Sequence, residues 1–323
     1  MELRGWLESP GEPEPWVVAT SGSSGRPKRV RLSRRAVLAS VAATERRLGA
    51  SGAWVLKLPD NYVAGIQVAA RSLVAGYEPL LDWPDAEWRS HTPWFTSLVP
   101  TQLHRLLGDP AEVAALQRAH TVLLGGGPID PALRAKAAAS DINVVATYGA
   151  AETAGGCVYD GVPLDGVALK IDADGRIRIG GPTLFDGYEG DPELTARTLV
   201  DGWFVTADAG RFDDDGRLHV LGRIDDVVVS GGVNVPGPAV AARLRAHPEV
   251  KDAEVVGVSD EEWGNRLVAF VVGPVDLDAL RDWVAEQHPR SWAPRQVVAL
   301  DEIPLLPNGK PDRVRLKSMV GDG

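Results

Sequence analysis

The chain of 323 residues has little cysteine, little histidine and a deficit of basic side chains. Its single cysteine, Cys157, excludes an intrachain disulfide and a metal site built from several thiolates. The six histidines show neither HxH nor HExxH spacing, so a zinc site of that kind is not indicated. With 34 Lys and Arg against 44 Asp and Glu, the net charge of −10 disfavours a nucleic-acid partner, whose phosphates need neutralisation.

Long apolar runs are absent as well. No stretch approaches the ~20 apolar residues that a helix needs to cross a bilayer. The opening residues MELRGWLESPGEPEP lack the basic-then-apolar layout of a secretory signal. The apolar fraction of 44% and the charged fraction of 24% are typical of a soluble globular protein. We therefore expect a cytoplasmic protein without membrane insertion, long enough for two domains of ordinary size.

Segments with helix and strand patterns alternate between residues 35 and 149. Apolar residues at helical spacing predict a helix over 35–50 with Ser33 as its N-cap, and a second over 131–140 with Pro131 in its first turn. Short apolar runs predict buried strands at 54–58, 94–100, 120–126 and 142–149. This alternation predicts a parallel α/β sheet.

The pattern of the sequence changes after residue 160. Two segments, 166–181 and 209–223, each place Asp-Gly between alternating residues, which predicts two β-hairpins. From about residue 227 a helix, two strands and a further helix follow in the pattern. This last region is expected to be a small α+β unit.

The stretch TSGSSGRPKRV (20–30) is rich in glycine, hydroxyl groups and cations, a composition that favours phosphate. A Walker loop would need Gly at position 27 and Ser or Thr after Lys28, but the chain has Pro27 and Arg29. Taken alone, the stretch fits a plain flexible surface loop better than a phosphate-binding loop.

Four later stretches indicate a function only when they are considered together and in their order along the chain. They are YGAAET (148–153), FVTAD (204–208), GRIDD with SGG (222–232) and PLLPNGKPDR (304–313). Each alone also fits an ordinary turn, hairpin or domain junction. Together with the first loop they resemble the adenylate-forming superfamily of acyl- and aryl-CoA ligases, adenylation domains and luciferases. The resemblance extends from Trp16 to Arg313.

The resemblance implies an α/β fold: a reduced, large N-terminal domain (1–224) with a β-hairpin-rich subdomain, and a small mobile α+β domain (225–323). It also implies that a carboxylate attacks the α-phosphorus of ATP and releases pyrophosphate, a step that depends on positioning and electrostatics. Lys310 is expected to bridge the carboxylate and the α-phosphate, and Glu152 to bind Mg²⁺. The expected contacts to the β,γ-phosphates are Thr20, Ser21, Gly22, Ser23, Ser24, Gly25 and Lys28.

The same resemblance assigns the nucleoside contacts. Tyr148 is expected to stack on adenine above Gly126 and Gly127, Asp208 to accept hydrogen bonds from the ribose hydroxyls, and Arg223 to assist there. In the second half-reaction the small domain turns about Asp225 and withdraws Lys310. The thiol of CoA then enters along a tunnel formed by Ser230, Gly231 and Gly232.

Several positions depart from the family's pattern. Ala151 replaces a Thr, Ala207 replaces a Gly, and Arg29 replaces the Gly after Lys28. Only 19 residues precede the phosphate loop, where the family has a further subdomain. We therefore expect a reduced core whose exposed face is covered by a smaller sheet or by a subunit contact, as in a homo-oligomer.

The stretches 57–76 and 148–167 resemble the short actinobacterial o-succinylbenzoate–CoA ligases of menaquinone biosynthesis. The resemblance makes Tyr62, Gly65 and Thr153 the candidate contacts of the acid. Arg71 or His104 could hold its ring carboxylate, against the alternatives of a surface arginine and an ordinary helix histidine. The other functions left open are a different aryl- or acyl-CoA ligase, a carrier-loading adenylation enzyme, and a non-catalytic nucleotide-binding remnant.

Overall fold

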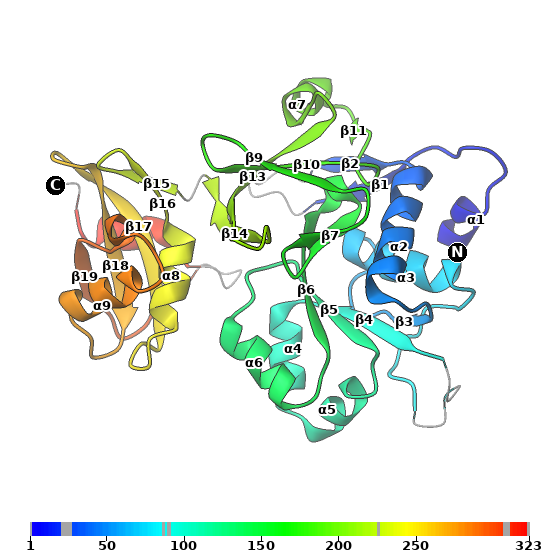
Figure 1. The fold of residues 1–323 in the computed structure, drawn as a ribbon, viewed down its shortest axis with the longest axis horizontal. Coiled ribbons are helices and arrows are strands. Elements are labelled where there is room, and N and C mark those ends of the chain that lie inside the picture. The colour runs from blue at the N-terminus through cyan, green and yellow to red at the C-terminus, as the bar shows by residue number, and fades with distance from the viewer. Residues whose placement is uncertain are drawn as a thin grey trace. The chain divides into compact units, whose positions relative to one another are not determined.

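The computed structural model describes residues 2–20, 28–85, 88, 92–224, 227–305 and 311–321. The chain divides into two compact units, shown in Figure 1. The first unit comprises residues 1–172, 177–206 and 212–218, and the second 173–176, 207–211 and 219–323. A search of the described residues for a long, apolar helix that could span a membrane finds none. The predicted hinge, Asp225, lies outside the described residues, so the domain boundary at 224/225 stays a proposal.

A six-stranded sheet in the order β3-β4-β5-β6-β7-β8 organises the first unit. Its strands are β3 (Ala53–Val55), β4 (Trp94–Leu98), β5 (Thr121–Leu124), β6 (Val144–Ala150), β7 (Gly155–Tyr159) and β8 (Val162–Pro163). The first four strands pair in parallel, and β7 and β8 continue the sheet antiparallel. Every residue of β4 and β5 is buried, as expected for parallel strands covered on both faces. The predicted parallel α/β sheet is thus confirmed.

Helices cover the two faces of this sheet. They are α2 (Arg34–Leu48), α3 (Val63–Val74), α4 (Pro100–Leu106), α5 (Pro110–Leu116) and α6 (Pro131–Ala139). The predicted N-cap is confirmed, because the Ser33 hydroxyl accepts a hydrogen bond of 3.3 Å from the Ala36 amide. Pro131 stands at the first position of α6, also as predicted.

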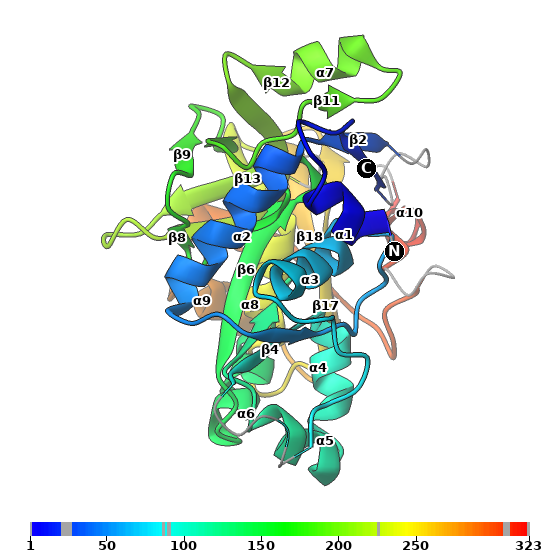
Figure 2. The same cartoon turned by 90° about the vertical axis from the view of Figure 1, so that its right-hand side faces the viewer.

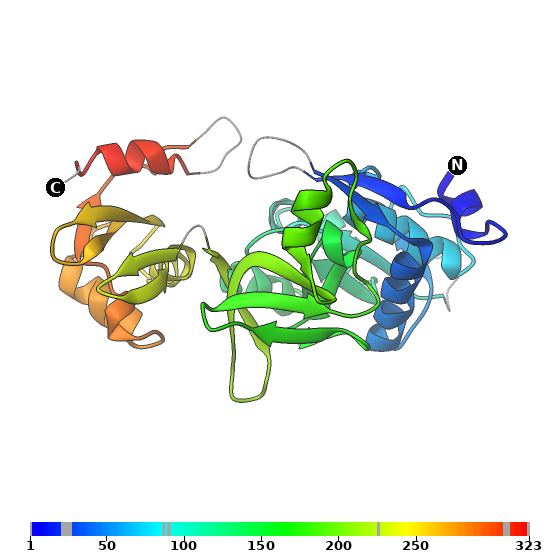
Figure 3. The ribbon, with the colours of Figure 1, turned by 90° about the horizontal axis from the view of Figure 1, so that it is seen from above.

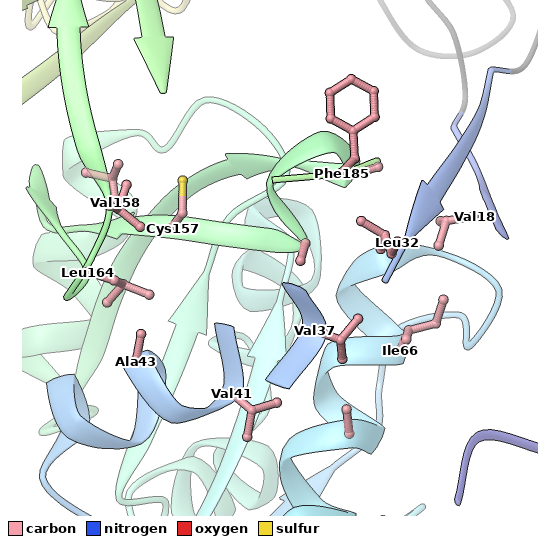
Figure 4. Close-up of a cluster of buried hydrophobic side chains, with 14 of the residues drawn as sticks. Val18, Leu32, Val37, Val41, Ala43, Ile66, Cys157, Val158, Leu164 and Phe185 are labelled. Carbon is pink, nitrogen blue, oxygen red and sulfur yellow. The ribbon is translucent and has the colours of Figure 1, made fainter. Parts of the chain in front are cut away.

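Successive strand residues point to opposite faces of the sheet and so join different cores. Trp54, Phe95 and Leu123 belong to a core with α2 and α3. Val55 and Val122 pack instead with α4, α5 and α6. Figures 1 and 2 show the two helix groups on the sheet, and Figure 4 shows side chains of α2, α3 and β7 meeting in the first core.

A small sheet flanks the position of the predicted phosphate loop. It has the order β1-β2-β11, with β1 (Trp16–Ala19), β2 (Arg29–Leu32) and β11 (Gly187–Tyr188). The loop connects β1 to β2, and its base closes through a 2.9 Å hydrogen bond from the Thr20 amide to the Lys28 carbonyl. Helix α1 (Glu2–Leu7) precedes β1, and helix α7 (Pro192–Thr198) follows β11.

The two predicted hairpins are confirmed. They contribute β9 (Ala168–Ile171), β10 (Arg176–Gly180), β13 (Trp203–Phe212) and β14 (Leu218–Arg223), joined by β12 (Leu199–Val200). The sheet has the order β12-β13-β10-β9, with β14 beside β13. In Figure 3 its strands have the green to yellow-green colours of residues 168–223.

The second unit contains the predicted helix, two strands and helix: α8 (Gly237–Arg245), β17 (Asp252–Asp260), β18 (Gly264–Val272) and α9 (Leu277–Ala285). It also contains β15 (Val227–Ser230), β16 (Val233–Pro236), η3 (Arg290–Trp292), β19 (Gln296–Ala299) and α10 (Arg313–Ser318). The pattern did not predict β19, which pairs in parallel with β18 and is only half-buried.

Candidate active site

A cavity of about 120 Å³ lies where β4, β5 and β6 end in the first unit. Residues at the carboxyl ends of these strands and just after them line it, as is usual at the carboxyl edge of a parallel sheet. One face of α3 and the start of β7 complete the wall. The lining residues from strand ends and turns include Ser97, Val99, Gly125, Gly126, Thr147 and Gly149.

Glycine keeps the walls of this cavity close to each other. A Cβ on Gly125 would lie 2.3 Å from the Thr147 hydroxyl oxygen, so no larger residue fits there. Gly126 has a φ of +78°, which favours glycine, whereas Gly127 has open space around it. The predicted place of Gly126 and Gly127 at the base of a ligand pocket is compatible with this position, and their contact with adenine stays a proposal.

Two buried polar side chains on successive turns of α3 face this cavity. Gln67 is 1% exposed and its side-chain amide has no hydrogen-bond partner in the described part of the chain. Arg71 is 6% exposed, its Nε has no partner there either, and its Nη2 donates a long hydrogen bond of 3.4 Å to the Tyr159 hydroxyl. The interpretation of Arg71 as a surface arginine is therefore wrong.

Arg71 also packs against an aromatic ring. Its guanidinium lies 4.9 Å from the centre of the Trp54 ring, and burial lowers its pKa. No carboxylate of the described residues pairs with it. A buried cation without an anion is costly, so the cavity is suited to a ligand that brings a negative charge. His104, the other candidate for this task, is exposed on α4 and does not line the cavity.

The three predicted substrate contacts lie beside the cavity and do not line it. Tyr62 is 43% exposed at the N-cap of α3. A Cβ on Gly65 would lie 2.1 Å from the Pro59 carbonyl oxygen, so this glycine lets α3 approach the preceding turn. The Thr153 hydroxyl is buried and donates to the Gly155 carbonyl at 2.7 Å. Contact of these residues with the acid stays a proposal.

Glu152 stands on the short helix η1 (Ala151–Thr153) that follows β6. It is 8% exposed, and its Oε1 accepts a hydrogen bond of 2.7 Å from the Tyr188 hydroxyl. Burial and the neighbouring Glu152 carboxylate raise the pKa of Tyr188, so its hydroxyl stays protonated and donates. The Lys28 ammonium lies 5.4 Å from the centre of the Tyr188 ring. The structure thus brings Lys28 and Glu152 together around Tyr188, which sequence reasoning missed.

A magnesium ion would fit Glu152. Mg²⁺ takes hard oxygen ligands and is often held by one or two carboxylates together with substrate phosphates. The described residues contain no cluster of three metal-binding side chains, so the triphosphate would supply further ligands beside Glu152. The remaining predicted phosphate contacts, Ser21, Gly22, Ser23, Ser24 and Gly25, lie outside the described residues, as does Lys310.

The structure places the predicted nucleoside contacts in both units. Tyr148 lies on β6 and is half-buried, but it is not among the residues that line the cavity. Asp208 on β13 and Arg223 at the end of β14 belong to the second unit, where Asp208 Oδ1 lies 3.8 Å from Arg223 Nη1. The pair is thus brought together, although its contact with ribose stays a proposal.

The predicted tunnel residues form the tight turn between β15 and β16. Ser230 pairs with Val233, while Gly231 and Gly232 have φ values of +57° and +77°, the conformation of a type I′ hairpin turn. The Gly231 amide donates to the Trp263 carbonyl at 2.9 Å, and a Cβ there would lie 2.6 Å from the Trp263 ring. Nothing lies within 4 Å of a Cβ on Gly232. The sequence carried no signal for this role of Trp263.

Comparisons with known proteins agree with these motifs. The model for the AMP-binding enzyme family matches residues 16–189, and that for the AMP-binding enzyme C-terminal domain matches residues 239–310. A probable 2-succinylbenzoate–CoA ligase of Mycobacterium tuberculosis is 43% identical over 318 residues, which cover 93% of this chain and 83% of that protein. A 2-succinylbenzoate–CoA ligase of Listeria innocua is 30% identical, with 93% and 69% covered.

Solved structures show the same likeness. The o-succinylbenzoate CoA synthetase of Bacillus subtilis, in complex with its acyl-adenylate intermediate, has a TM-score of 0.76 and 27% identity, covering 94% of this chain and 68% of that one. An amide bond synthetase of Marinactinospora thermotolerans has a TM-score of 0.76 and 29% identity, with 94% and 69% covered.

Proposed function

Because this chain belongs to the AMP-binding enzyme family, we propose that it is an AMP-forming acid–thiol ligase that joins o-succinylbenzoate to CoA in menaquinone biosynthesis. The substrates are o-succinylbenzoate, ATP and CoA, and the products are the acyl-CoA, AMP and pyrophosphate. The relatives named 2-succinylbenzoate–CoA ligase, one of them 43% identical over most of the chain, support this assignment. A cytoplasmic location is part of the proposal, since ATP and CoA are used there.

The buried pair Arg71 and Gln67 is the observation that carries the choice of acid. o-Succinylbenzoate has two carboxylates, of which only one reacts. The other needs a cation if it is to enter an apolar cavity. Arg71 supplies an unpartnered Nε–H donor and a buried positive charge, and the Gln67 amide supplies further donors. An unbranched fatty acid would leave all these donors unsatisfied, which costs binding energy.

In the first half-reaction, an oxygen of the aliphatic carboxylate bonds to the α-phosphorus of ATP while the bond to pyrophosphate breaks. Lys28 and the phosphate loop would hold the β,γ-phosphates, and Lys310 would neutralise the charge that develops between the two anions. Mg²⁺ would screen the triphosphate while bound through Glu152. In the second half-reaction the CoA sulfur bonds to the acyl carbon, and AMP leaves with the oxygen of the former carboxylate.

The test is a measurement of pyrophosphate release over a panel of acids, with and without CoA, with the thioester identified by mass spectrometry. We expect the highest kcat/KM with o-succinylbenzoate. If benzoate, malonate or a medium-chain fatty acid is preferred, the substrate is wrong and the ligase class stands. Thioester formation on a carrier protein in place of CoA would instead identify a carrier-loading enzyme.

The substitution Arg71→Met tests the carboxylate subsite. We expect kcat/KM for o-succinylbenzoate to fall by about 10²–10³, because an unpaired buried carboxylate is costly. The analogue 4-oxo-4-phenylbutanoate lacks the ring carboxylate, so its already low kcat/KM should barely respond. His104→Ala is the control, since His104 is exposed and away from the cavity. An equal loss for both acids would refute the subsite.

A further inference from the structure

Tyr188 connects two groups that the proposed reaction needs. Its hydroxyl donates to Glu152 Oε1 at 2.7 Å, and its ring lies beside the Lys28 ammonium at 5.4 Å. Tyr188 is 5% exposed, so both contacts occur where water competes little. A hydrogen bond from a hydroxyl to a buried carboxylate is charge-assisted and therefore among the stronger ones.

The backbone holds Tyr188 firmly in this place. On β11, Tyr188 pairs with Val30 of β2, the strand that leaves the phosphate loop. Its amide donates to the Thr195 hydroxyl at 2.8 Å, and Arg29 forms an ion pair with the adjacent Glu189 across the two strands. A β11 anchored in this way keeps the tyrosine in register with the base of the loop.

Glu152 is restrained from two sides as well. Its carbonyl accepts a hydrogen bond of 2.9 Å from the Phe185 amide, and its Oε1 is taken by the Tyr188 hydroxyl. In the described part of the chain Oε2 makes no hydrogen bond. One oxygen is thus oriented by the protein and the other is left for a ligand, which matches a monodentate carboxylate on a magnesium ion.

We propose that Tyr188 is the positioning residue of the adenylation half-reaction, which orients Glu152 for Mg²⁺ and the Lys28 ammonium for the triphosphate. This inference rests on the proposed function. Without the hydroxyl, the Glu152 side chain regains rotational freedom that it must lose each time the metal binds. The phenol ring itself packs edge-on against Phe185 at 4.9 Å, so Tyr188→Phe retains the packing and removes only the hydrogen bond.

The decisive measurement is the affinity for Mn²⁺, a paramagnetic substitute for Mg²⁺. Binding is followed by electron paramagnetic resonance in the presence of α,β-methylene ATP, which cannot form an acyl-adenylate. We expect Tyr188→Phe to weaken Mn²⁺ binding about ten-fold or more, since hydrogen bonds to charged groups are the stronger class. Tyr77→Phe, in the loop after α3, removes a hydroxyl of the same kind from a residue outside the proposed site, so it is the matched control and should leave the affinity unchanged.

A double-mutant cycle tests whether the effect passes through Glu152. In a Glu152→Gln chain, adding Tyr188→Phe should cause no further loss of Mn²⁺ affinity. Conversion of a supplied acyl-adenylate to the CoA thioester should proceed at the wild-type rate in Tyr188→Phe, because that step uses no metal–ATP complex.

Unchanged Mn²⁺ affinity in Tyr188→Phe, additive effects in the cycle, or a parallel loss in both half-reactions would each overturn the proposal. The metal-binding assay uses neither acid nor CoA. If the wild-type enzyme fails to make the thioester, the proposed function is refuted. The Mn²⁺ affinities would still show whether Tyr188 positions Glu152.

Discussion

The turn between β15 and β16 offers a test in which two neighbouring glycines act as each other's control. Gly231 and Gly232 both have positive φ, at +57° and +77°. An alanine in the left-handed region costs roughly 1–2 kcal/mol, so the two substitutions share a similar backbone penalty. Only their surroundings differ. A Cβ on Gly231 would lie 2.6 Å from the Trp263 ring, and one on Gly232 meets nothing within 4 Å.

Trp263 cannot easily make room for that Cβ. The Arg295 guanidinium lies 3.3 Å from the centre of its ring, and its carbonyl accepts the Gly231 amide at 2.9 Å. We therefore expect the turn to shift in Gly231→Ala. Overpacking of this kind adds ~1–3 kcal/mol, which corresponds to about 5- to 150-fold in rate where the turn guides the CoA thiol.

The assay separates the two half-reactions. Pyrophosphate exchange reports adenylation, and single-turnover conversion of a supplied acyl-adenylate reports thioester formation, with thermal unfolding measured for both variants. We expect the rate of pyrophosphate exchange to be unchanged in both variants. Thioester formation should be slower in Gly231→Ala than in Gly232→Ala, by the rate factor that corresponds to the ~1–3 kcal/mol of overpacking. Equal rates in the two variants would refute the role of the Trp263 contact. A parallel fall of both half-reactions with a lowered Tm would point to general destabilisation.

Three further predictions follow from other residues. Lys310→Ala should slow adenylation by ~10²–10³ and spare thioester formation from a supplied acyl-adenylate, as single-turnover rates would reveal; equal losses in both would contradict its role. Gly65→Ala should destabilise the fold by ~1–3 kcal/mol in urea unfolding, because its Cβ would lie 2.1 Å from the Pro59 carbonyl oxygen, whereas Gly127→Ala, with open space, should be tolerated. Burial raises the pKa of Cys157 to about 12, so the folded protein should not react with a disulfide reagent at neutral pH until denaturant is added; rapid reaction of the native thiol would contradict this.

Local patterns were enough for the elements that are stabilised by near neighbours. Ser33 caps α2 because its hydroxyl meets an amide three residues later, a relation contained within one turn. The strands β4 and β5 are buried on both faces, and continuous apolar runs predict this without knowledge of the partners. The small domain's helix, two strands and helix follow from the same periodicity.

Part of the chemistry of the site could also be predicted from the sequence. The order of five short motifs pointed to the family and its two-step reaction, because each motif supplies a residue type that phosphate, ribose or metal requires. The motifs did not show which side chains line the same cavity. Arg71 looked like a surface arginine because it is charged, yet it is 6% exposed next to Gln67.

Long-range pairing decided the rest. Tyr188 and Glu152 are 36 residues apart, and their contact depends on a two-residue strand, β11, that is too short to carry a periodic signal. Gly231 and Trp263 are likewise separated in sequence and meet through a turn and the connection between β17 and β18. The helices and strands with a clear periodic pattern could be predicted from the sequence alone, because such a pattern depends on residues only a few positions apart. The class of reaction followed from the resemblance of the five ordered motifs to a known family. The partners of Glu152, the burial of Arg71 and the packing of Gly231 on Trp263 required the three-dimensional structure, because these contacts form when distant segments pack together.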